Sequence, residues 1–548
     1  MPVFCGTLLP QARPCASFCP TPFPRSLCSS PESARPKSDF TYRSICTLPP
    51  LGLLFLTALA APAVYTYLDL PSRSSINLFL TTDTLYNPPY RLFTQSPRPR
   101  QPGPLPPLPT MAVGGANGGF PNGESKTFDR NIRYIPYSYT SADHHGSALR
   151  LVLAARPEWE GAESNVEFVR FTDGITNTLL KAVNKRRGLS KEEVDREAIL
   201  LRAYGNGTDL IIDRHRETQN HELLMRHRLA PELLARFENG MMYRFVQGTV
   251  TQPEDLRKPA IYKAVARKLA QWHAVVPCIP GRTGHSRKNS RADDGNAPSF
   301  ASLGDAEFQQ AIDGIAPGKP SPNVWTVMQK WIFALPSDTD AQRAVQAELQ
   351  KELGTLVSEL SQRPGLGANG LVFAHCDLLS GNVIVLPKIT TGGVTNGDKA
   401  TESVTFIDYE YATPSPAAFD IANHFAEWGG FDCDFSVLPT RAQRREFITE
   451  YVHAYFSILE ENPTDPVDEA AEVERLFSEV DLFRGVPGFY WGIWALIQAT
   501  ISEIDFDYAS YAETRLGEYW AWRSEVSGER EKAGQEQPLR ERRWAQEK

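Results

Sequence analysis

The sequence lacks the features of a nucleic-acid-binding protein, of a disulfide-stabilised domain and of a repeat protein. Its 57 Lys and Arg are outnumbered by 65 Asp and Glu, and the resulting net charge of −8 does not suit a polyanionic partner. Its eight cysteines form no CxxC pair, and five lie in the first fifty residues, so we expect a reducing, cytoplasmic compartment. No segment recurs at the spacing of a solenoid or propeller. With 41% hydrophobic residues, the chain can still bury a sizeable core.

Proline and positive charge are concentrated in the first 110 residues. This stretch holds 21 of the 43 prolines and nine Lys and Arg against four Asp and Glu. Such a proline density interrupts helices and central strands, so we expect residues 1–110 to be a poorly structured leader outside the fold. An apolar run at 44–68 could anchor the chain in a membrane or target it. The alternative is a leader that does not belong to the protein, with translation starting at Met111.

From Val166 onward the hydrophobic pattern indicates a packed domain. Residues 217–230 have a helical pattern, and three runs have the composition of strands. The strand-like runs are VEFVRF (166–171), AILLRAYG (198–205) and MMYRFVQG (241–248). These elements predict a sheet-containing N-terminal lobe over residues 165–250. We expect the preceding residues, 111–164, to be a flexible lead-in.

Helical patterns dominate residues 251–523. One helix is marked by an apolar face, formed by Ile261, Val265, Leu269, Trp272 and Val276. Two short strand-like runs, at 383–386 and 404–409, interrupt the helices, and the polar stretch between them is expected to be a long hairpin loop. Residues 524–548, rich in Lys, Arg and Glu, are expected to be a charged tail that is either a solvated helix end or disordered.

The stretch FAHCDLLSGNVIVL carries the most informative polar residues. Asp377 lies five residues before Asn382, a strand-like run follows, and FIDYEY then brings Asp408. Phosphoryl transfer needs a residue that orients the attacking hydroxyl, oxygen ligands for Mg²⁺ and cations on the phosphates. The catalytic loop of protein kinases has the same Asp-to-Asn spacing, and a later Asp there binds metal. The pattern therefore indicates a kinase-like phosphotransferase.

Six motifs make the chain resemble the choline/ethanolamine kinase family from about Val166 to Trp522. They are DGITN (173–177), LLRAYGNGTDLIIDR (200–214), HCDLLSGNVI (375–384), FIDYEYA (406–412), FDIANHFAEW (419–428) and FYWGIWALIQATISEIDFDY (489–508). The resemblance implies an α+β, protein-kinase-like bilobal fold with a small antiparallel-sheet N-lobe and a larger, mostly helical C-lobe. It also implies ATP and Mg²⁺ in the cleft, and transfer of the γ-phosphate to the hydroxyl of ethanolamine or choline.

The resemblance assigns roles to the residues of the catalytic motifs. Asp377 is similar to the catalytic Asp that accepts a hydrogen bond from the substrate hydroxyl, and Asn382 and Asp408 are similar to the metal ligands. Arg202 resembles the cation on the phosphate side, a task that suits a permanently charged forked donor. Glu217 on the following helix is its expected ion-pair partner.

The nucleotide is expected to lie against two further segments. By resemblance, Gly174, Thr176 and Asn177 would form a turn that covers the nucleotide, although a plain hairpin turn has the same composition. The strand-like run at 241–248 matches the segment that leads to the adenine hinge. Backbone groups from Phe245 to Gln247 would bind the base there.

The acceptor site of such an enzyme must hold an ammonium group, which carboxylates and aromatic faces stabilise. By resemblance, Glu427, Trp491, Trp494 and Tyr508 supply this site. The two tryptophans are spaced i, i+3 and so share one helix face, which is also a common pattern of core packing. Asp420 is expected to brace the catalytic loop from behind.

Two features favour the ethanolamine kinase branch of the family. They are the stretch HFAEWGGFDCDFSVLPTRAQRREF and the pair Leu378 and Leu379. One departure is Cys376, which stands where the family usually has Asn and cannot donate and accept as Asn does. We therefore expect an ethanolamine kinase that makes phosphoethanolamine for phosphatidylethanolamine synthesis. Choline-type relatives are often dimeric, so the resemblance leaves a homodimer open.

Other functions stay open on the sequence. Choline kinase or dual specificity is the nearest alternative, because both acceptors carry the same charge and the same hydroxyethyl arm. A kinase-like scaffold without turnover is an alternative of another class, although Asp377, Asn382 and Asp408 are all present. An antibiotic phosphotransferase of similar fold would call for an open acidic cleft, which Trp491 and Trp494 fit poorly.

Overall fold

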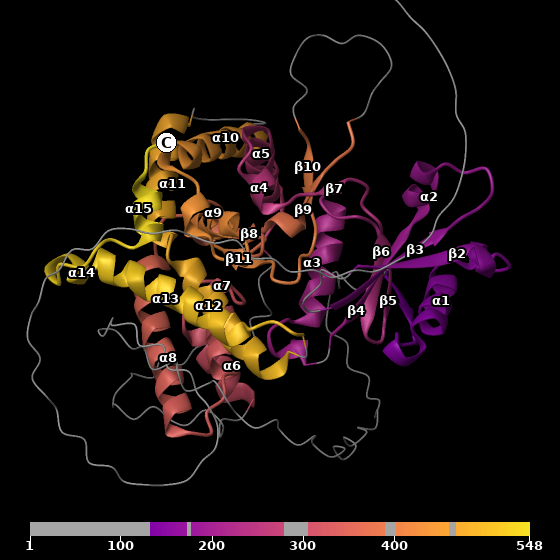
Figure 1. The fold of residues 1–548 in the computed structure, drawn as a ribbon, viewed down its shortest axis with the longest axis horizontal. Coiled ribbons are helices and arrows are strands. Elements are labelled where there is room, and N and C mark those ends of the chain that lie inside the picture. The colour runs from indigo at the N-terminus through magenta and orange to yellow at the C-terminus, as the bar shows by residue number, and fades with distance from the viewer. Residues whose placement is uncertain are drawn as a thin grey trace, which may run out of the picture. The chain divides into compact units, whose positions relative to one another are not determined.

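A sheet with its helices and a larger group of helices make up the described part of the chain (Figure 1). All of it lies within one compact unit. The computed structural model describes residues 132–171, 177–205, 207–278, 305–388, 402–459, 467–502 and 504–548. The expected leader at 1–110, with its apolar run at 44–68, lies outside these residues. Among the helices that are described, none combines the length and the apolarity needed to cross a bilayer.

The first group, the N-lobe, is built on a six-stranded sheet with the order β1–β5–β6–β4–β3–β2. Its strands are β1 (Arg133–Ile135), β2 (Val166–Phe171), β3 (Asn177–Asn184), β4 (Ile199–Tyr204), β5 (Leu233–Phe237) and β6 (Gly240–Arg244). Neighbouring strands are antiparallel, except that β1 runs parallel to β5. The small antiparallel-sheet lobe is therefore confirmed, with β1, β3 and β5 added to the runs expected from the sequence.

Strands β3 and β4 alternate between two environments. Leu180 of β3 and Leu201 of β4 are buried in a core on one face of the sheet. Leu179, Leu200 and Arg202 line a cavity. Because successive side chains of a strand point to opposite faces, this register sends Arg202 from the middle of β4 into the cavity.

The expectation of a flexible lead-in at 111–164 is wrong from β1 onward. Helix α1 (His144–Ala155) packs Leu151 and Val152, both fully buried, into the same core as Leu180 and Leu201. Its first turn is capped by Asp143, whose side chain accepts a hydrogen bond from the N–H of Gly146. The sequence signal was weak because β1 is only three residues long, too short for a periodic pattern.

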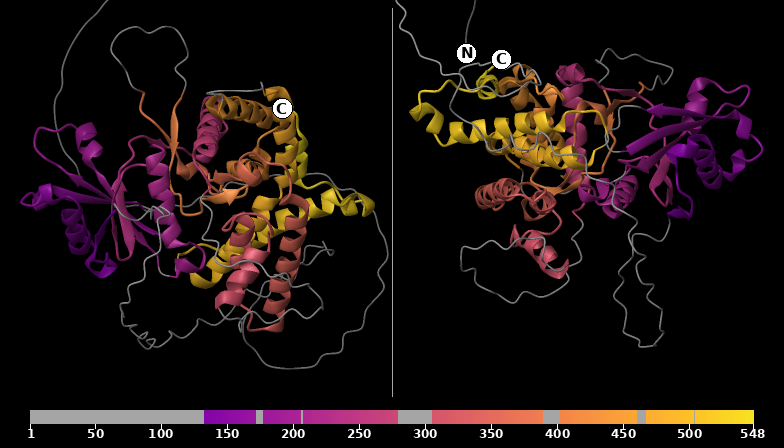
Figure 2. Two further views of the ribbon diagram at one scale, coloured as in Figure 1. Left: turned by 180° about the vertical axis from the view of Figure 1, so that it is seen from behind. Right: turned by 60° about the horizontal axis from the view of Figure 1, so that its bottom comes forward.

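Two helices follow within the N-lobe. Helix α2 (Lys191–Glu197) begins with a capping box of Ser190 and Glu193. Helix α3 (Arg214–Arg226) begins after Asp213, whose side chain accepts two main-chain hydrogen bonds, and ends before the predicted limit of residue 230. It lies beside the sheet on the side of the second group (Figures 1 and 2). There, Nδ2 of Asn220 donates to the main-chain oxygen of Ala412 at 2.8 Å.

The second group, the C-lobe, is largely helical, as expected for residues 251–523. Its helices are α4 (Pro253–Leu256), α5 (Pro259–Val275), α6 (Asp305–Gly314), α7 (Val324–Phe333), α8 (Asp340–Leu360), α9 (Ala417–Ala426), α10 (Arg441–Leu459), α11 (Glu469–Phe483), α12 (Val486–Ile501), α13 (Tyr508–Val526), α14 (Glu529–Lys532) and α15 (Leu539–Ala545). The predicted apolar face of α5 is buried from Ile261 to Val276. Helix α12 packs against α7, α9 and α13 and is buried from Val486 to Gln498.

Short strands fix the segments that carry the expected catalytic residues. Strand β8 (Val372–Ala374) pairs with β11 (Thr413–Ser415), and β9 (Val383–Val385) pairs with β10 (Val404–Phe406) and β7 (Thr249–Val250). The loop between β8 and β9 is thus held by strand pairing at both ends. The predicted hairpin of β9 and β10 is confirmed, and most of its polar connection lies outside the described residues.

The expectation of a solvated or disordered tail at 524–548 is wrong for α15, whereas α14 has no buried residue. Trp544 of α15 is only 5% exposed, and the guanidinium of Arg444 lies 3.9 Å from its ring centroid. The main-chain N–H of Arg441 donates to the oxygen of Gln546 at 2.8 Å. The charged composition suggested that these residues are exposed to solvent. Instead, Arg540 and Glu541 are buried and form ion pairs with other elements of the C-lobe.

Candidate active site

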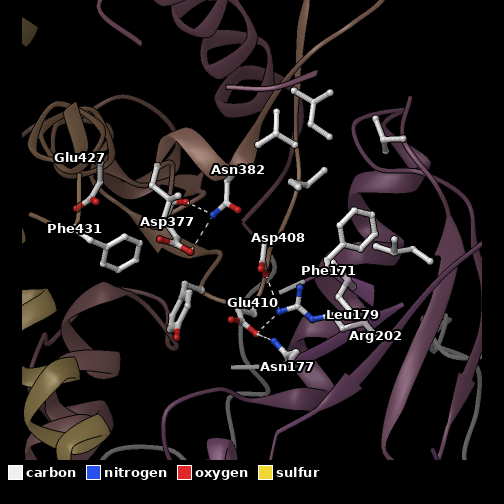
Figure 3. Close-up of a pocket in the computed structure, with 18 of the residues that line it drawn as sticks. Phe171, Asn177, Leu179, Arg202, Asp377, Asn382, Asp408, Glu410, Glu427 and Phe431 are labelled. Atoms are coloured by element: carbon white, nitrogen blue, oxygen red, sulfur yellow. Dashed lines mark hydrogen bonds and ion pairs between the residues drawn. The ribbon is translucent and has the colours of Figure 1, made fainter. Parts of the chain in front are cut away.

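A cavity of about 410 Å³ is lined by side chains from both lobes. The N-lobe contributes Phe171, Asn177 and Arg202, and the C-lobe contributes Asp377 and Glu427 among others. Figure 3 shows the polar residues of both lobes converging on the cavity. A concave site with a few convergent polar groups in an apolar lining is the usual form of a small-molecule site.

The loop after β8 brings Asp377 and Asn382 together. Nδ2 of Asn382 donates to the main-chain oxygen of Asp377 at 2.8 Å and to Oδ2 of its carboxylate at 3.1 Å. Both residues are buried and line the cavity. The amide oxygen of Asn382 points away from Asp377 (Figure 3). Asn382 therefore fixes the carboxylate of Asp377, and the side-chain oxygen of Asn382 remains available to a ligand.

Asp420 of α9 holds this loop from behind, as the sequence suggested. Its Oδ2 accepts from the N–H of His375 at 2.9 Å, and its Oδ1 accepts from the N–H of Cys376 at 2.8 Å. The ring of His273 lies 2.9 Å from the same carboxylate. Burial alone would raise the pKa of Asp420, but His273 and these donors hold it below its usual range. Asp420 thus stays a charged brace.

Two residues of the site have left-handed backbone conformations. Cys376 and Asp408 both have φ of 63°, a region that costs a residue with a side chain about 1–3 kcal/mol and clusters at functional sites. Among residues with a side chain, Asn and Asp adopt this region most readily, so Cys376 is the more unusual of the two. Cys376 is held in it by Asp420, and its Sγ lies 3.3 Å from Oγ of Ser415.

Arg202 makes the ion pair with Glu217 that the sequence predicted. Its Nε lies 3.1 Å from Oε1 of Glu217. The same guanidinium also reaches into the C-lobe, where its Nη2 lies 2.9 Å from Oδ1 of Asp408 and contacts Oε2 of Glu410. Arg202 therefore joins the N-lobe sheet to the segment after β10 (Figure 3).

Glu410 is a central residue of the site that sequence reasoning missed. Its Oε2 accepts from Arg202, from Nη1 of Arg214 at 3.1 Å and from Nδ2 of Asn177 at 3.1 Å. It follows Asp408 by two residues, in the segment after β10 where Asp408 has a left-handed backbone and residues 410–411 form a turn. The second carboxylate in FIDYEY was the signal that could have found it.

This cluster contains more carboxylates than cations, because Arg202 and Arg214 face Glu217, Asp408 and Glu410. Burial raises the pKa of Glu217 to about 7, against the charge of Arg202. Burial also raises the pKa of Asp377 well above its usual range, and the charges of Asp408, Glu427 and Glu410 add to this effect. Although burial opposes it, the three carboxylates raise the pKa of Arg202 well above its usual value. The site therefore favours further positive charge.

The donor set at Asn382 and Asp408 consists of oxygens, which suit Mg²⁺. Within the described ranges, no three or more His, Cys, Asp or Glu side chains form a metal-binding group. A metal held by these two residues would need other ligands, and Mg²⁺ is usually bound by one or two protein side chains together with phosphates and waters. The surplus of buried carboxylate charge fits such a cation.

The part of the cavity beside the sheet is apolar. It is lined by Leu179, Leu200, Phe245, Val250, Ile384 and Ile407. Gly248 brings the segment after β6 so close to β9 that a Cβ atom would lie 2.3 Å from Ile384, and its φ is 152°. These residues could enclose a flat aromatic ring such as adenine.

The predicted nucleotide-binding residues are only partly brought together. Phe245 lines the cavity, but its N–H already donates to the oxygen of Ala198 at 3.0 Å. The side chain of Gln247 turns to the main chain of Glu192 and does not line the cavity. Asn177 lines it through the contact with Glu410. Gly174 and Thr176 lie outside the described residues.

Glu427 and aromatic side chains line the opposite part of the cavity (Figure 3). The rings of Trp491 and Trp494 are perpendicular, with centroids 5.5 Å apart. Nε1 of Trp494 donates to the hydroxyl of Tyr411 at 2.8 Å, which fixes the ring. Oε1 of Glu427 accepts from Nη2 of Arg515 at 2.9 Å. An acidic group beside aromatic faces suits an ammonium ion.

Tyr508 is not among the residues that line the cavity. Its ring packs against that of Trp494, with centroids 5.8 Å apart. The wall is completed instead by aromatic residues that the sequence did not single out for it. They are Tyr411, Phe431 and Tyr511. Tyr411 and Phe431 come from segments after β10 and α9 that no helical spacing connects to α12.

Known proteins are similar in sequence to the larger part of this chain. The sequence profile of the choline/ethanolamine kinases matches residues 168–520. Ethanolamine kinase 1 of Mus musculus is 33% identical over 390 residues, which cover 69% of this chain and 90% of the relative. A probable ethanolamine kinase of Nematostella vectensis is 32% identical over 400 residues, with coverage of 71% and 96%.

One solved structure has the same fold at lower sequence identity. An ethanolamine kinase of Plasmodium vivax superposes with a TM-score of 0.50 at 24% identity, and the match covers 69% of this chain and 88% of that one.

Proposed function

The chain belongs to the choline/ethanolamine kinase family, and we propose that it transfers the γ-phosphate of ATP to the hydroxyl of ethanolamine. The observation that carries the proposal is a single cavity in which Asp377 stands between the Arg202 cluster and the acidic, aromatic wall around Glu427. A phosphate donor and an ammonium-bearing acceptor could therefore meet at Asp377. The products would be phosphoethanolamine and ADP.

Asp377 would orient the acceptor hydroxyl and take its proton. The acceptor oxygen then bonds to the γ-phosphorus while the bond to the ADP oxygen breaks. The hydrogen bond from Asn382 to Oδ2 of Asp377 fixes the carboxylate, so its other oxygen can face the acceptor. This positioning is the main contribution that a protein makes to phosphoryl transfer.

Asn382 and Asp408 would hold Mg²⁺ through their side-chain oxygens. When bound, the ion neutralises developing charge on the phosphate oxygens. Arg202 would contact the phosphates from the N-lobe, while Glu217 and Glu410 hold its guanidinium in place. The apolar side chains around Phe245 would enclose the adenine.

Glu427 and the rings of Trp491 and Trp494 would bind the ammonium group. Because Arg515 occupies Oε1 of Glu427, Oε2 is the atom left for the acceptor. A primary ammonium brings three N–H donors that need acceptors, whereas a trimethylated one needs only an aromatic enclosure. A carboxylate oxygen and the hydroxyl of Tyr411 in this wall favour ethanolamine over choline.

The replacement Asp377→Asn tests the proposed base. It keeps the shape of the side chain but removes its proton-accepting charge, so kcat should fall by about 100-fold or more. Binding of ATP and the melting temperature should change little. The matched control is Asp338→Asn at an exposed position of the C-lobe, which should keep wild-type turnover. Turnover retained by Asp377→Asn would contradict the assignment.

The cysteine usage supports a cytoplasmic location, and cell fractionation would test it. Homodimerisation, and membrane contact through residues 44–68, stay predictions from the sequence.

A further inference from the structure

A chain of buried ion pairs runs from the cavity wall to helix α15. It begins at Glu427, whose Oε1 accepts from Arg515 of α13. Nη1 of Arg515 lies 3.8 Å from Oε2 of Glu518, and Oε1 of Glu518 contacts Nε of Arg540 on α15. The side chains of Arg515, Glu518 and Arg540 are exposed by only 1–3%. Charges therefore alternate in sign along this series of ion pairs.

The series of ion pairs continues on α15 and ends at Arg484, which follows α11. Nη1 of Arg540 donates to Oε1 of Glu541 at 2.7 Å, and Nε of Arg484 donates to Oε2 of Glu541 at 2.9 Å. From Glu427 to Arg484 there are three carboxylates and three cations, so each charge is balanced by a neighbour. Removal of one member would leave a buried charge without compensation.

Helix α15 lies beyond residues 168–520, the part of the chain that matches the family. Its docking is extensive, because Trp544 is buried and Arg543 donates to the main-chain oxygen of Leu438 at 2.8 Å. The wall of the cavity is therefore connected to a segment outside the matched region.

We propose that Arg540 is a positioning residue for the acceptor: it neutralises Glu518 and so leaves Arg515 to hold Glu427 and Tyr511 in the geometry that binds the ammonium group. Arg515 is the shared element, because its Nε donates to the hydroxyl of Tyr511 at 2.8 Å while its Nη2 donates to Glu427. Without Arg540, Glu518 attracts Arg515 away from Glu427. This inference rests on the proposed function, since it takes the ammonium group to bind at Glu427.

The test is acceptor kinetics of the full 548-residue chain, with Mg-ATP saturating and ethanolamine varied. Arg540→Met should raise the KM for ethanolamine about tenfold, within the usual range of coupling between sites. The KM for ATP and kcat should change by less than about twofold, because the substitution affects binding of the acceptor alone. The matched control is Arg542→Met on the same helix, whose side chain is 51% exposed and pairs with the exposed Glu536.

A double variant separates charge compensation from simple docking of α15. In Glu518→Gln with Arg540→Met no unpaired charge is left near Arg515, so the KM for ethanolamine should return to within about threefold of wild type. A double variant with a KM as high as that of Arg540→Met would overturn the proposal and assign Arg540 a structural role. If the single variant fails to fold, a KM of the double variant more than about threefold above wild type overturns the proposal as well.

The pH profile gives a second readout. The groups that face Glu427 from neighbouring elements are Asp377, Cys433, Tyr511, Arg515 and Glu518. Burial raises the pKa of Glu427, Arg515 lowers it and Glu518 raises it again. In Arg540→Met the free charge of Glu518 should move the acidic limb of kcat/KM for ethanolamine to higher pH, and the double variant should move it back.

The outcomes also separate the inference from the function on which it rests. A wild-type chain without ethanolamine-dependent ADP release would refute the proposed function. A wild-type chain that turns over ethanolamine, with the same KM in Arg540→Met, would refute the role of Arg540 alone.

Discussion

Arg202 forms ion pairs with three carboxylates, and its removal should lower the free energy of unfolding by an amount that can be estimated from them. Its side chain is 6% exposed, and it lies against Glu217, Glu410 and Asp408, whose side chains are 5%, 3% and 28% exposed. Arg202→Met would leave Arg214 as the cation for three carboxylates. Breaking a buried ion pair by removing one partner costs about 3–5 kcal/mol.

Protonation of a carboxylate that loses its partner reduces this loss of stability, and the size of the reduction depends on pH. Burial already raises the pKa of Glu217 to about 7, and loss of Arg202 raises it further. Glu217 can therefore become neutral in the variant at modest acidity. We expect Arg202→Met to lower the free energy of unfolding by about 3–5 kcal/mol at pH 8 and by less at pH 6.

Urea unfolding followed by tryptophan fluorescence measures this loss. The second variant, Arg202→Met with Glu410→Gln, removes one carboxylate together with the cation and should recover about half of the lost free energy. Arg202→Lys keeps the charge and should lie between wild type and Arg202→Met. A free energy for Arg202→Met within about 1 kcal/mol of wild type at pH 8, or no recovery in the double variant, would refute this view of the cluster.

Two further predictions concern the metal and the pH dependence of stability. Asp408→Ala should raise the Mg²⁺ concentration needed for half-maximal turnover about tenfold or more, and an unchanged Mg²⁺ titration would exclude Asp408 as a ligand. Burial lowers the pKa of His221 to about 4, whereas an unfolded His titrates near 6.5; its contribution to stability is therefore complete above pH 6.5 and is lost as the pH falls towards 4. His221→Gln can keep the hydrogen bond to the oxygen of Pro231. Between pH 6.5 and pH 5, urea unfolding should show that the variant loses about 1.5 kcal/mol less stability than wild type. Equal losses would contradict the assignment.

The catalytic loop could be predicted from the sequence because its information is local. Asp377 and Asn382 form hydrogen bonds within one loop, so their spacing in the sequence is enough to predict that the two side chains meet. The pair of Arg202 and Glu217 was implied by the resemblance to the family, and the strand and helix that carry the two residues, β4 and α3, are close together in the sequence. In both cases a short stretch of chain determines which side chains meet.

The missed residues depend on contacts between distant segments. Glu410 meets Asn177 across 233 positions, and no local pattern shows that contact. Tyr508 is aromatic and helical like Trp494, so the sequence alone does not separate the two. Only the packing of α13 against α12 decides that the ring of Tyr508 contacts Trp494 instead of lining the cavity. The tail was misjudged for the same reason, since the partners that bury the charges of α15 lie on α13 and at Arg484.

The central claim is tested most directly by ADP release from the 548-residue chain with Mg-ATP and either ethanolamine or choline across a concentration series. We predict ethanolamine-dependent turnover with a kcat/KM at least about tenfold above that for choline, because the acceptor wall offers a carboxylate oxygen to a primary ammonium. Folded protein that binds ATP but shows no acceptor-dependent turnover, or that prefers choline, would contradict the claim.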